Sequence, residues 1–249
     1  MKPAIAAPRR GADIRDRIRP QKVSIGLDVL GRSERRLRAS GCTPLQAVLQ
    51  GRRKRAYAHF PADDVCDGRT NSQYFFHAHP DRSGESGHFH LFLRRQAVPP
   101  AILRRKIPVS SEAGRDGSGM VHLGGISLDR KGMPMRLFTT NLWVTGGDFY
   151  FAEDTLRLLE RFSVFSAFTR EPSALVNQWV SALAWVFHGH FALLLEQRDQ
   201  VMAAWARRHP DRNVFEEKSL EMPSVMRIDY AAQIKLITQS IGRHGSIAA

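Results

Sequence analysis

Four histidines, arranged as two His-x-His pairs, are the residues of this sequence whose types and spacing could do chemistry. The first pair is His77 and His79, the second is His88 and His90, and a polar loop over residues 80–87 separates them. Imidazole nitrogens bind transition metals, whereas several imidazoles packed together without a metal need hydrogen-bond partners and repel one another once protonated. The pattern therefore indicates either a metal-binding or catalytic cluster, or a hydrogen-bonded cluster of structural histidines.

The residues around the two pairs are typical of a β-hairpin. Both flanks are rich in aromatic and branched apolar residues, and the loop over residues 80–87 contains proline and glycine. Because residues two apart on a strand share a face, we expect all four imidazoles to project from one side of the sheet. We predict that His79 lies opposite His88 and that His77 lies opposite His90. A slip of one residue would send one pair to the other face, so the hypothesis depends on this register.

Two further residues could supply acid–base chemistry beside a bound metal. A third strand is expected over residues 121–128, where His122 would share a face with Gly124 and Ile126 and would join the cluster as a fifth imidazole. Glu85 lies in the hairpin loop. We predict that His122 or Glu85 acts as the catalytic acid or base.

A fourth strand, expected over residues 135–145, could line a substrate pocket. Thr139, Asn141 and Trp143 would share one face of it and combine polar groups with an aromatic ring. We predict that they bind substrate, although the same set could equally lie on the solvent-facing side of an ordinary antiparallel sheet.

The donor set decides which metals fit. Imidazoles without a nearby pair of thiolates favour Fe, Zn, Cu or Ni over Mg or Ca, which prefer oxygen ligands. Three histidines with an open position suit a catalytic metal, and Phe75, Phe92 and Trp143 would give the site an apolar wall. We therefore predict a mononuclear enzyme in which three or four of the histidines His77, His79, His88 and His90 hold a divalent transition metal (Fe or Zn), with a small-molecule substrate. We favour a non-haem iron oxygenase over a zinc hydrolase. The alternatives are a non-catalytic protein that binds a small ligand or nucleic acid, and a metal-free hydrolase that uses the histidines as acids and bases.

Common catalytic motifs do not narrow this choice. The sequence contains no HExxH helix, P-loop, GxGxxG or GxSxG motif. A cupin would have a second, glycine-rich histidine motif, which does not occur around His122. A histidine-triad hydrolase would have a third histidine where Phe92 stands.

Three segments together carry a resemblance to a known family. They are His77-Ala-His79, the run Gly-His-Phe-His-Leu-Phe-Leu over residues 87–93, and Leu-Phe-Thr-Thr-Asn-Leu-Trp-Val-Thr over residues 137–145. This combination resembles a family of bacterial proteins catalogued as a domain of unknown function. The resemblance extends over roughly residues 45–240. It implies that the three segments belong to one domain, and it brings no activity with it.

The net charge of +13 is concentrated near the N-terminus. Residues 1–55 are rich in Arg and contain few acidic residues, whereas the remainder of the chain is nearly neutral. We expect residues 1–26 to form a basic, disordered arm that could make weak contacts with polyanions. The arm contains no aromatic residues that could stack on bases.

The composition is otherwise that of an ordinary folded protein. With 43% hydrophobic residues the chain can build a core, and it contains no apolar run long enough to cross a membrane. Cys42 and Cys66 are too few for a disulfide scaffold or a cysteine zinc site. The arginine-rich N-terminus does not resemble a secretory signal, so a cytoplasmic location without a membrane partner is expected.

These patterns predict an α+β fold in which an antiparallel sheet, built on the histidine hairpin, packs against C-terminal helices. We expect one domain over residues 27–249, helical over 27–55, forming the sheet over 56–146, and helical again over 147–245. Within the last part, apolar periodicity predicts helices over residues 153–165, 172–208 and 224–241. His188 and His190 lie on or beside an apolar stripe and are expected to be buried and hydrogen-bonded.

Overall fold

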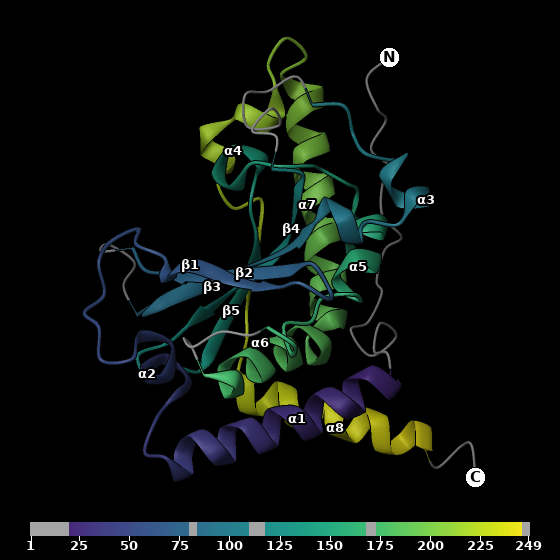
Figure 1. Ribbon diagram of the computed structural model, residues 1–249. Helices are drawn as coiled ribbons and strands as arrows, with labels where there is room; N and C mark the ends of the chain where they lie inside the picture. The colour runs from purple at the N-terminus through teal and green to yellow at the C-terminus, as the bar shows by residue number, and fades with distance from the viewer. Residues whose placement is uncertain (1–19, 80–83, 110–117, 168–172, 246–249) are drawn as a thin grey trace.

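The computed structural model describes residues 20–79, 84–109, 118–167 and 173–245, with side chains placed up to residue 241. Six antiparallel strands form one sheet in the order β1-β2-β3-β4-β5-β6 (Figure 1). The strands are β1 (Phe60–Asp67), β2 (Ser72–His77), β3 (Gly87–Arg94), β4 (Met120–Leu128), β5 (Pro134–Thr139) and β6 (Ser224–Arg227). The predicted α+β class, with an antiparallel sheet and C-terminal helices, is confirmed.

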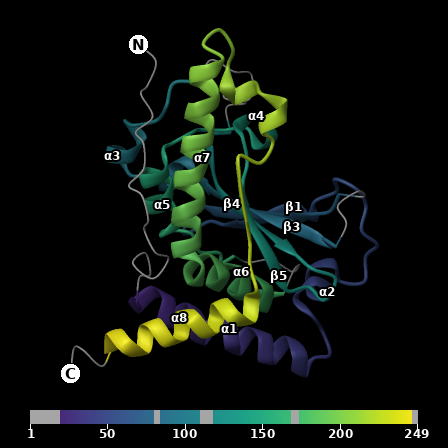
Figure 2. The ribbon, with the colours of Figure 1, turned by 180° about the vertical axis from the view of Figure 1, so that it is seen from behind.

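Helices cover one face of this sheet. The helices are α1 (Pro20–Ala39), α2 (Pro44–Leu49), α3 (Pro100–Leu103), α4 (Leu142–Thr145), α5 (Ala152–Leu159), α6 (Ala174–Val186), α7 (His188–Arg208) and α8 (Tyr230–Gly245). The long helix α7 runs behind the sheet in the view of Figure 1 and in front of it in the view of Figure 2, and α1 and α8 lie together beneath α6 in both views. Within the described part of the chain no single helix is both long and apolar enough to cross a bilayer; α6 and α7, bent by 65°, pass that test only as a pair.

The core lies between the sheet and these helices. Alternate residues of the strands point into it, so that Tyr74, Phe76 and Phe89 are fully buried and Phe89 contacts Trp179 of α6 with ring centroids 6.1 Å apart. Gly124 is needed where β4 passes close to a side chain of α7. A Cβ atom on Gly124 would lie 2.4 Å from the ring of Phe191, and its φ of +151° disfavours other residues.

The N-terminal helix differs from the prediction. We expected a disordered arm up to residue 26, but α1 begins at Pro20. Val23, Val29 and Leu30 are buried on one side of α1, which packs against α6, and this apolar stripe outweighs the run of basic residues on the other side. Residues 1–19 of the predicted arm lie outside the described residues.

The C-terminal helices also differ in detail. The predicted helix over residues 172–208 is two helices that meet at Phe187, and the one predicted over 224–241 begins only at Tyr230. Residues 224–227 instead form β6, which pairs with β5 and brings Ser224 opposite Thr139. The sheet therefore extends beyond the predicted range of residues 56–146.

Candidate metal centre

The register of the β2–β3 hairpin brings three histidines to one face of the sheet. His77 lies opposite His88, and Phe75 lies opposite His90. The predicted pairs, His79 with His88 and His77 with His90, are therefore wrong by two residues. A shift of two keeps every side chain on its expected face, because the side-chain period of a strand is two. His79 lies just beyond the end of β2.

Three imidazoles converge on one point. His77, His88 and His90 each offer a ring nitrogen, and these nitrogens all lie within 4.8 Å of one another. The Nε2 atoms of His77 and His88 are 2.6 Å apart. His88 and His90 are buried, while His77 is half-buried. A transition metal with bonds of about 2.0–2.1 Å to imidazole nitrogen could take a place among donors so arranged.

A buried carboxylate fixes the orientation of His88. Nδ1 of His88 contacts Glu85 Oε1, and Arg136 forms an ion pair with the other carboxylate oxygen. The side chains of His88 and Glu85 are each 2% exposed. A carboxylate that accepts the Nδ1 proton leaves Nε2 with a free lone pair, which is how metal-binding histidines are commonly held. Glu85, predicted as a catalytic acid or base, has both carboxylate oxygens engaged in this contact and in the ion pair.

A second chain of contacts reaches His90 from behind. His90 Nδ1 lies 3.1 Å from Nε2 of His122, whose Nδ1 lies 3.0 Å from Thr140 Oγ1. Burial, and then the neighbouring His122, hold the pKa of His90 well below its usual value. Loss of water, and then the Arg198 guanidinium, lower the pKa of His122 to about 3. Both rings are therefore neutral near pH 7, the form in which imidazole binds metals.

A β-bulge puts His122 on this face. His122 lies opposite Phe92 and Gly124 lies opposite Leu91, so that Leu123 is an extra residue in β4. The prediction that His122 shares a face with Gly124 and Ile126 is wrong: both of those face the helices. His122 does join the histidines, as predicted, but it lines a small cavity behind them.

The histidines open into a pocket of about 460 Å³. Its other walls come from Tyr57, His79, Phe138, Thr140, Trp143, Val144, Glu221 and Met222. The His79 ring stacks on that of His88, with centroids 5.2 Å apart and an interplanar angle of 19°. Of the predicted apolar wall, only Trp143 lines this pocket. Phe75 and Phe92 pack beside His90, with ring centroids at 5.0 and 6.3 Å.

Two of the three predicted substrate-binding residues have structural contacts instead. Thr139 is buried on the helix side of the sheet and its hydroxyl lies 2.6 Å from that of Ser224. Asn141 caps α4 and donates a hydrogen bond to the carbonyl of Val214. β5 ends at Thr139, so the alternation that was extended to Trp143 does not apply there. Thr140, the residue that does reach the pocket, carried no signal in the sequence beyond its place between the two.

One comparison with known proteins places the chain. Residues 27–228 match the model of a family described as a domain of unknown function (DUF6969). The chain belongs to this family. No curated protein and no solved structure shows significant similarity to it. The predicted resemblance to such a family is confirmed, and the region that matches the DUF6969 family contains every described strand and all three converging histidines.

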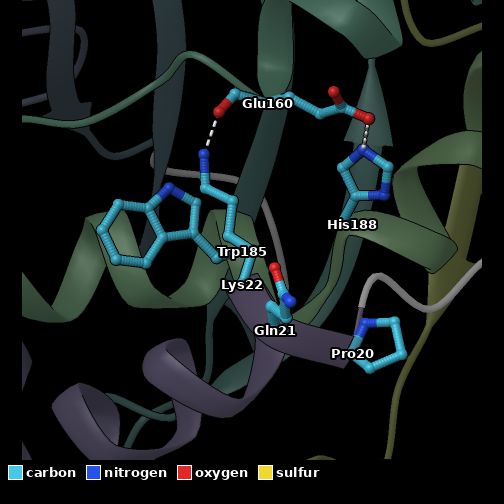
Figure 3. Close-up of a pocket in the computed structure, with 6 residues that line it drawn as sticks. All are labelled: Pro20, Gln21, Lys22, Glu160, Trp185 and His188. Atoms are coloured by element: carbon cyan, nitrogen blue, oxygen red, sulfur yellow. Dashed lines mark hydrogen bonds and ion pairs between the residues drawn. The ribbon is translucent and has the colours of Figure 1, made fainter.

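A second cavity, of about 550 Å³, lies partly outside the family region (Figure 3). The Lys22 amine donates to the carbonyl of Glu160 and lies 5.0 Å from the centre of the Trp185 ring, and His188 Nε2 lies 3.4 Å from the Glu160 carboxylate. These contacts join the start of α1 to the end of α5. His190, nearby on α7, is buried with Nε2 3.0 Å from Gln233 Oε1, as expected for a structural histidine.

Proposed function

We propose that His77, His88 and His90 bind one transition metal ion and that the protein is a mononuclear metal-dependent enzyme. The observation that carries this proposal is the convergence of three imidazole nitrogens at a pocket, with one imidazole held by a buried carboxylate. Imidazoles placed for structure alone would each be expected to have separate partners, whereas here one ring nitrogen from each of three imidazoles lies within 4.8 Å of the other two.

The pocket supports a catalytic role for the metal rather than a structural one. Structural sites are usually closed by four protein ligands, whereas catalytic sites keep a position open for water or substrate. Three histidines leave such a position, and the adjoining cavity of about 460 Å³ is of the size that small molecules occupy. His79 and Glu221, both at this pocket, are the groups placed to transfer protons or to complete the ligand set.

The composition of the walls favours oxygenation over hydrolysis. Phe138, Trp143, Val144 and Met222 form an apolar part of the pocket wall, which suits a substrate with a carbon-rich portion. Bound iron would supply activation of dioxygen, whereas bound zinc would supply an activated water. We therefore favour a non-haem iron oxygenase, with a zinc hydrolase as the alternative use of the same ligands.

Elemental analysis of protein purified without a histidine tag tests the metal site. We expect about one iron or zinc ion per chain, because the described residues contain one cluster of three histidines that could hold a metal. The double variant His77→Ala/His90→Ala should lose this metal. The matched control His209→Ala, at the end of α7, should retain it. Metal content far below one per chain, unchanged by the double variant, would refute the proposal.

The choice between iron and zinc has its own test. Protein reconstituted with Fe(II) without oxygen should bind nitric oxide, detected by electron paramagnetic resonance, if an open position exists on the metal. Zinc that iron does not displace, together with no nitric oxide signal, would favour the hydrolase.

A metal-free hydrolase is the second candidate, because His77 and His88 already contact each other. Their Nε2 atoms, 2.6 Å apart, could share a proton and act as an acid–base pair. Activity that survives strong chelation would favour this mechanism.

A further inference from the structure

We propose that the substrate of the histidine pocket is a small molecule with a carboxylate or phosphate group, and that Arg53 and Arg55 bind this group. The inference rests on the proposed metal-dependent function and adds the class of substrate. It depends on a third cavity, near the histidine pocket, which Arg52, Arg53 and Arg55 line and which is called the basic cavity below.

The segment that joins α2 to β1 carries the charge. Residues 52–55 are Arg-Arg-Lys-Arg, and the sequence has no acidic residue between Glu34 and Asp63. Arg53 and Arg55 are exposed, and no carboxylate in the described ranges forms an ion pair with either. Both side chains line a cavity of about 460 Å³, together with Arg52 and His59. Positive charge is thus concentrated around one hollow.

This basic cavity lies one aromatic ring away from the candidate metal ligands. The His59 ring stacks on Phe75 with centroids 3.8 Å apart and an interplanar angle of 8°. The same ring is 5.9 Å from that of His77, and Phe75 is 5.0 Å from His90. The stacked His59 and Phe75 rings therefore form a wall between the arginines and the candidate metal ligands, and a substrate that spans this wall would place its anionic group at the arginines.

Hydrogen bonds hold the basic segment against the hairpin. Tyr57 N–H donates to the carbonyl of Ala78 at 3.0 Å, and the Lys54 amine donates to the carbonyl of Ser86 at 3.1 Å. These bonds fix the segment on either side of Arg55, along the end of the hairpin (Figure 1). Tyr57 lines the histidine pocket and Arg55 lines the basic cavity, so one short segment forms a wall of both.

Guanidinium groups suit a compact oxyanion. Arginine presents paired N–H donors that match two oxygens of a carboxylate or phosphate, and it keeps its charge at every physiological pH. Proteins that bind polynucleotides usually place their basic residues along a groove that tracks the phosphate backbone. Here the basic residues surround a cavity next to a small-molecule pocket, which favours a small anion over a nucleic-acid backbone.

Calorimetric titration of the metal-loaded full chain with phenyl phosphate tests the assignment. We expect measurable binding that weakens by about tenfold or more in Arg53→Gln/Arg55→Gln, because charge-assisted hydrogen bonds to the phosphate are lost. Arg207→Gln/Arg208→Gln, which removes the same charge from the exposed end of α7, should bind as the original chain does. No binding at millimolar phenyl phosphate, or equal binding by both double variants, would overturn the proposal.

Two further experiments test this inference independently of the proposed metal site and against nucleic-acid binding. His77→Ala/His90→Ala should lose metal but keep most of its affinity for phenyl phosphate, so failure of the metal proposal would be recognised separately. Titration with polyuridylate tests whether the arginines instead bind the phosphate backbone of a nucleic acid. Polyuridylate that binds far more tightly than phenyl phosphate, with the same dependence on Arg53 and Arg55, would overturn the small-molecule assignment; weaker binding supports it.

Discussion

The two faces of the sheet differ in what their side chains do. On β3, Phe89 points toward the helices and is fully buried among aromatic rings, while its neighbours His88 and His90 point the other way into a polar network. Adjacent residues on one strand thus belong to different environments. The comparison teaches that stability and chemistry are separated here by the direction of a side chain and not by distance along the chain.

The helix-covered face relies on apolar area and close packing. The opposite face relies on particular partners, such as the Glu85 carboxylate for His88 and the His122 ring for His90. Substitutions on the first face should therefore change the free energy of unfolding, whereas those on the second should change metal affinity with smaller effects on stability.

Phe89→Ala should give the largest effect. Removal of this fully buried ring would leave a cavity beside Tyr74, Phe76 and Trp179, and we expect unfolding to become easier by about 3–5 kcal/mol. Urea denaturation measures the loss, and metal content per folded chain should stay unchanged. Loss of metal from folded Phe89→Ala protein would show that the two faces are not independent.

The next largest effect is expected from acid, which should destabilise the protein through His190, a buried histidine on the helix side of the sheet. Burial lowers the pKa of His190 to about 4, from an unfolded value near 6.5. The unfolded chain then binds more protons below pH 6.5, so stability falls as the pH drops from about 6.5 toward 4, by about 2 kcal/mol at pH 5. Denaturation of the original chain and of His190→Gln at pH 7 and pH 5 measures this. An equal pH dependence in both proteins would contradict the assignment to His190.

Glu85→Gln should weaken metal binding by about 10- to 100-fold, because the carboxylate that orients His88 loses its charge. Competition with a chromophoric chelator measures the affinity. Glu153→Gln is the matched control, since Glu153 pairs with Arg157 on the exposed surface of α5 and should leave metal affinity unchanged. Equal affinities in all three proteins would remove the orienting role of Glu85.

Thr140→Val should have the smallest effect. It removes the hydroxyl that contacts His122, which in turn contacts His90 at the proposed metal site, and we expect about 1 kcal/mol of lost stability and only a few-fold weaker metal binding. The same denaturation and chelator measurements apply. A loss of metal as large as that expected for Glu85→Gln would mean that His122 acts directly at the metal.

The sequence predicted which faces the hairpin residues occupy, because alternation is a local property. It did not predict the pairing of His77 with His88, because register depends on how many residues the turn uses, and β2 ends at His77 while β3 begins only at Gly87. The histidines still share one face because the observed register differs from the predicted one by two residues, an even number. The capping box of Thr43 and Gln46 at the start of α2 is local in the same way, since it spans only four residues.

Long-range pairings were not accessible in the same way. The strand at residues 224–227 exists because β5 offers it an edge, and apolar spacing alone suggested a helix there. The buried contact of Thr139 with Ser224 follows from that pairing. Likewise, the basic cavity depends on how the segment after α2 lies against the hairpin, which its composition does not specify.

The extra residue in β4 has a consequence for how the strand tolerates change in length. Before Leu123 the even-numbered residues of β4 face the histidine side of the sheet, and after it the odd-numbered residues do. Deletion of a single residue here would leave the chemical character of the strand intact and yet exchange the surroundings of His122 with those of its neighbours. In this part of the chain the number of residues therefore matters as much as their identity.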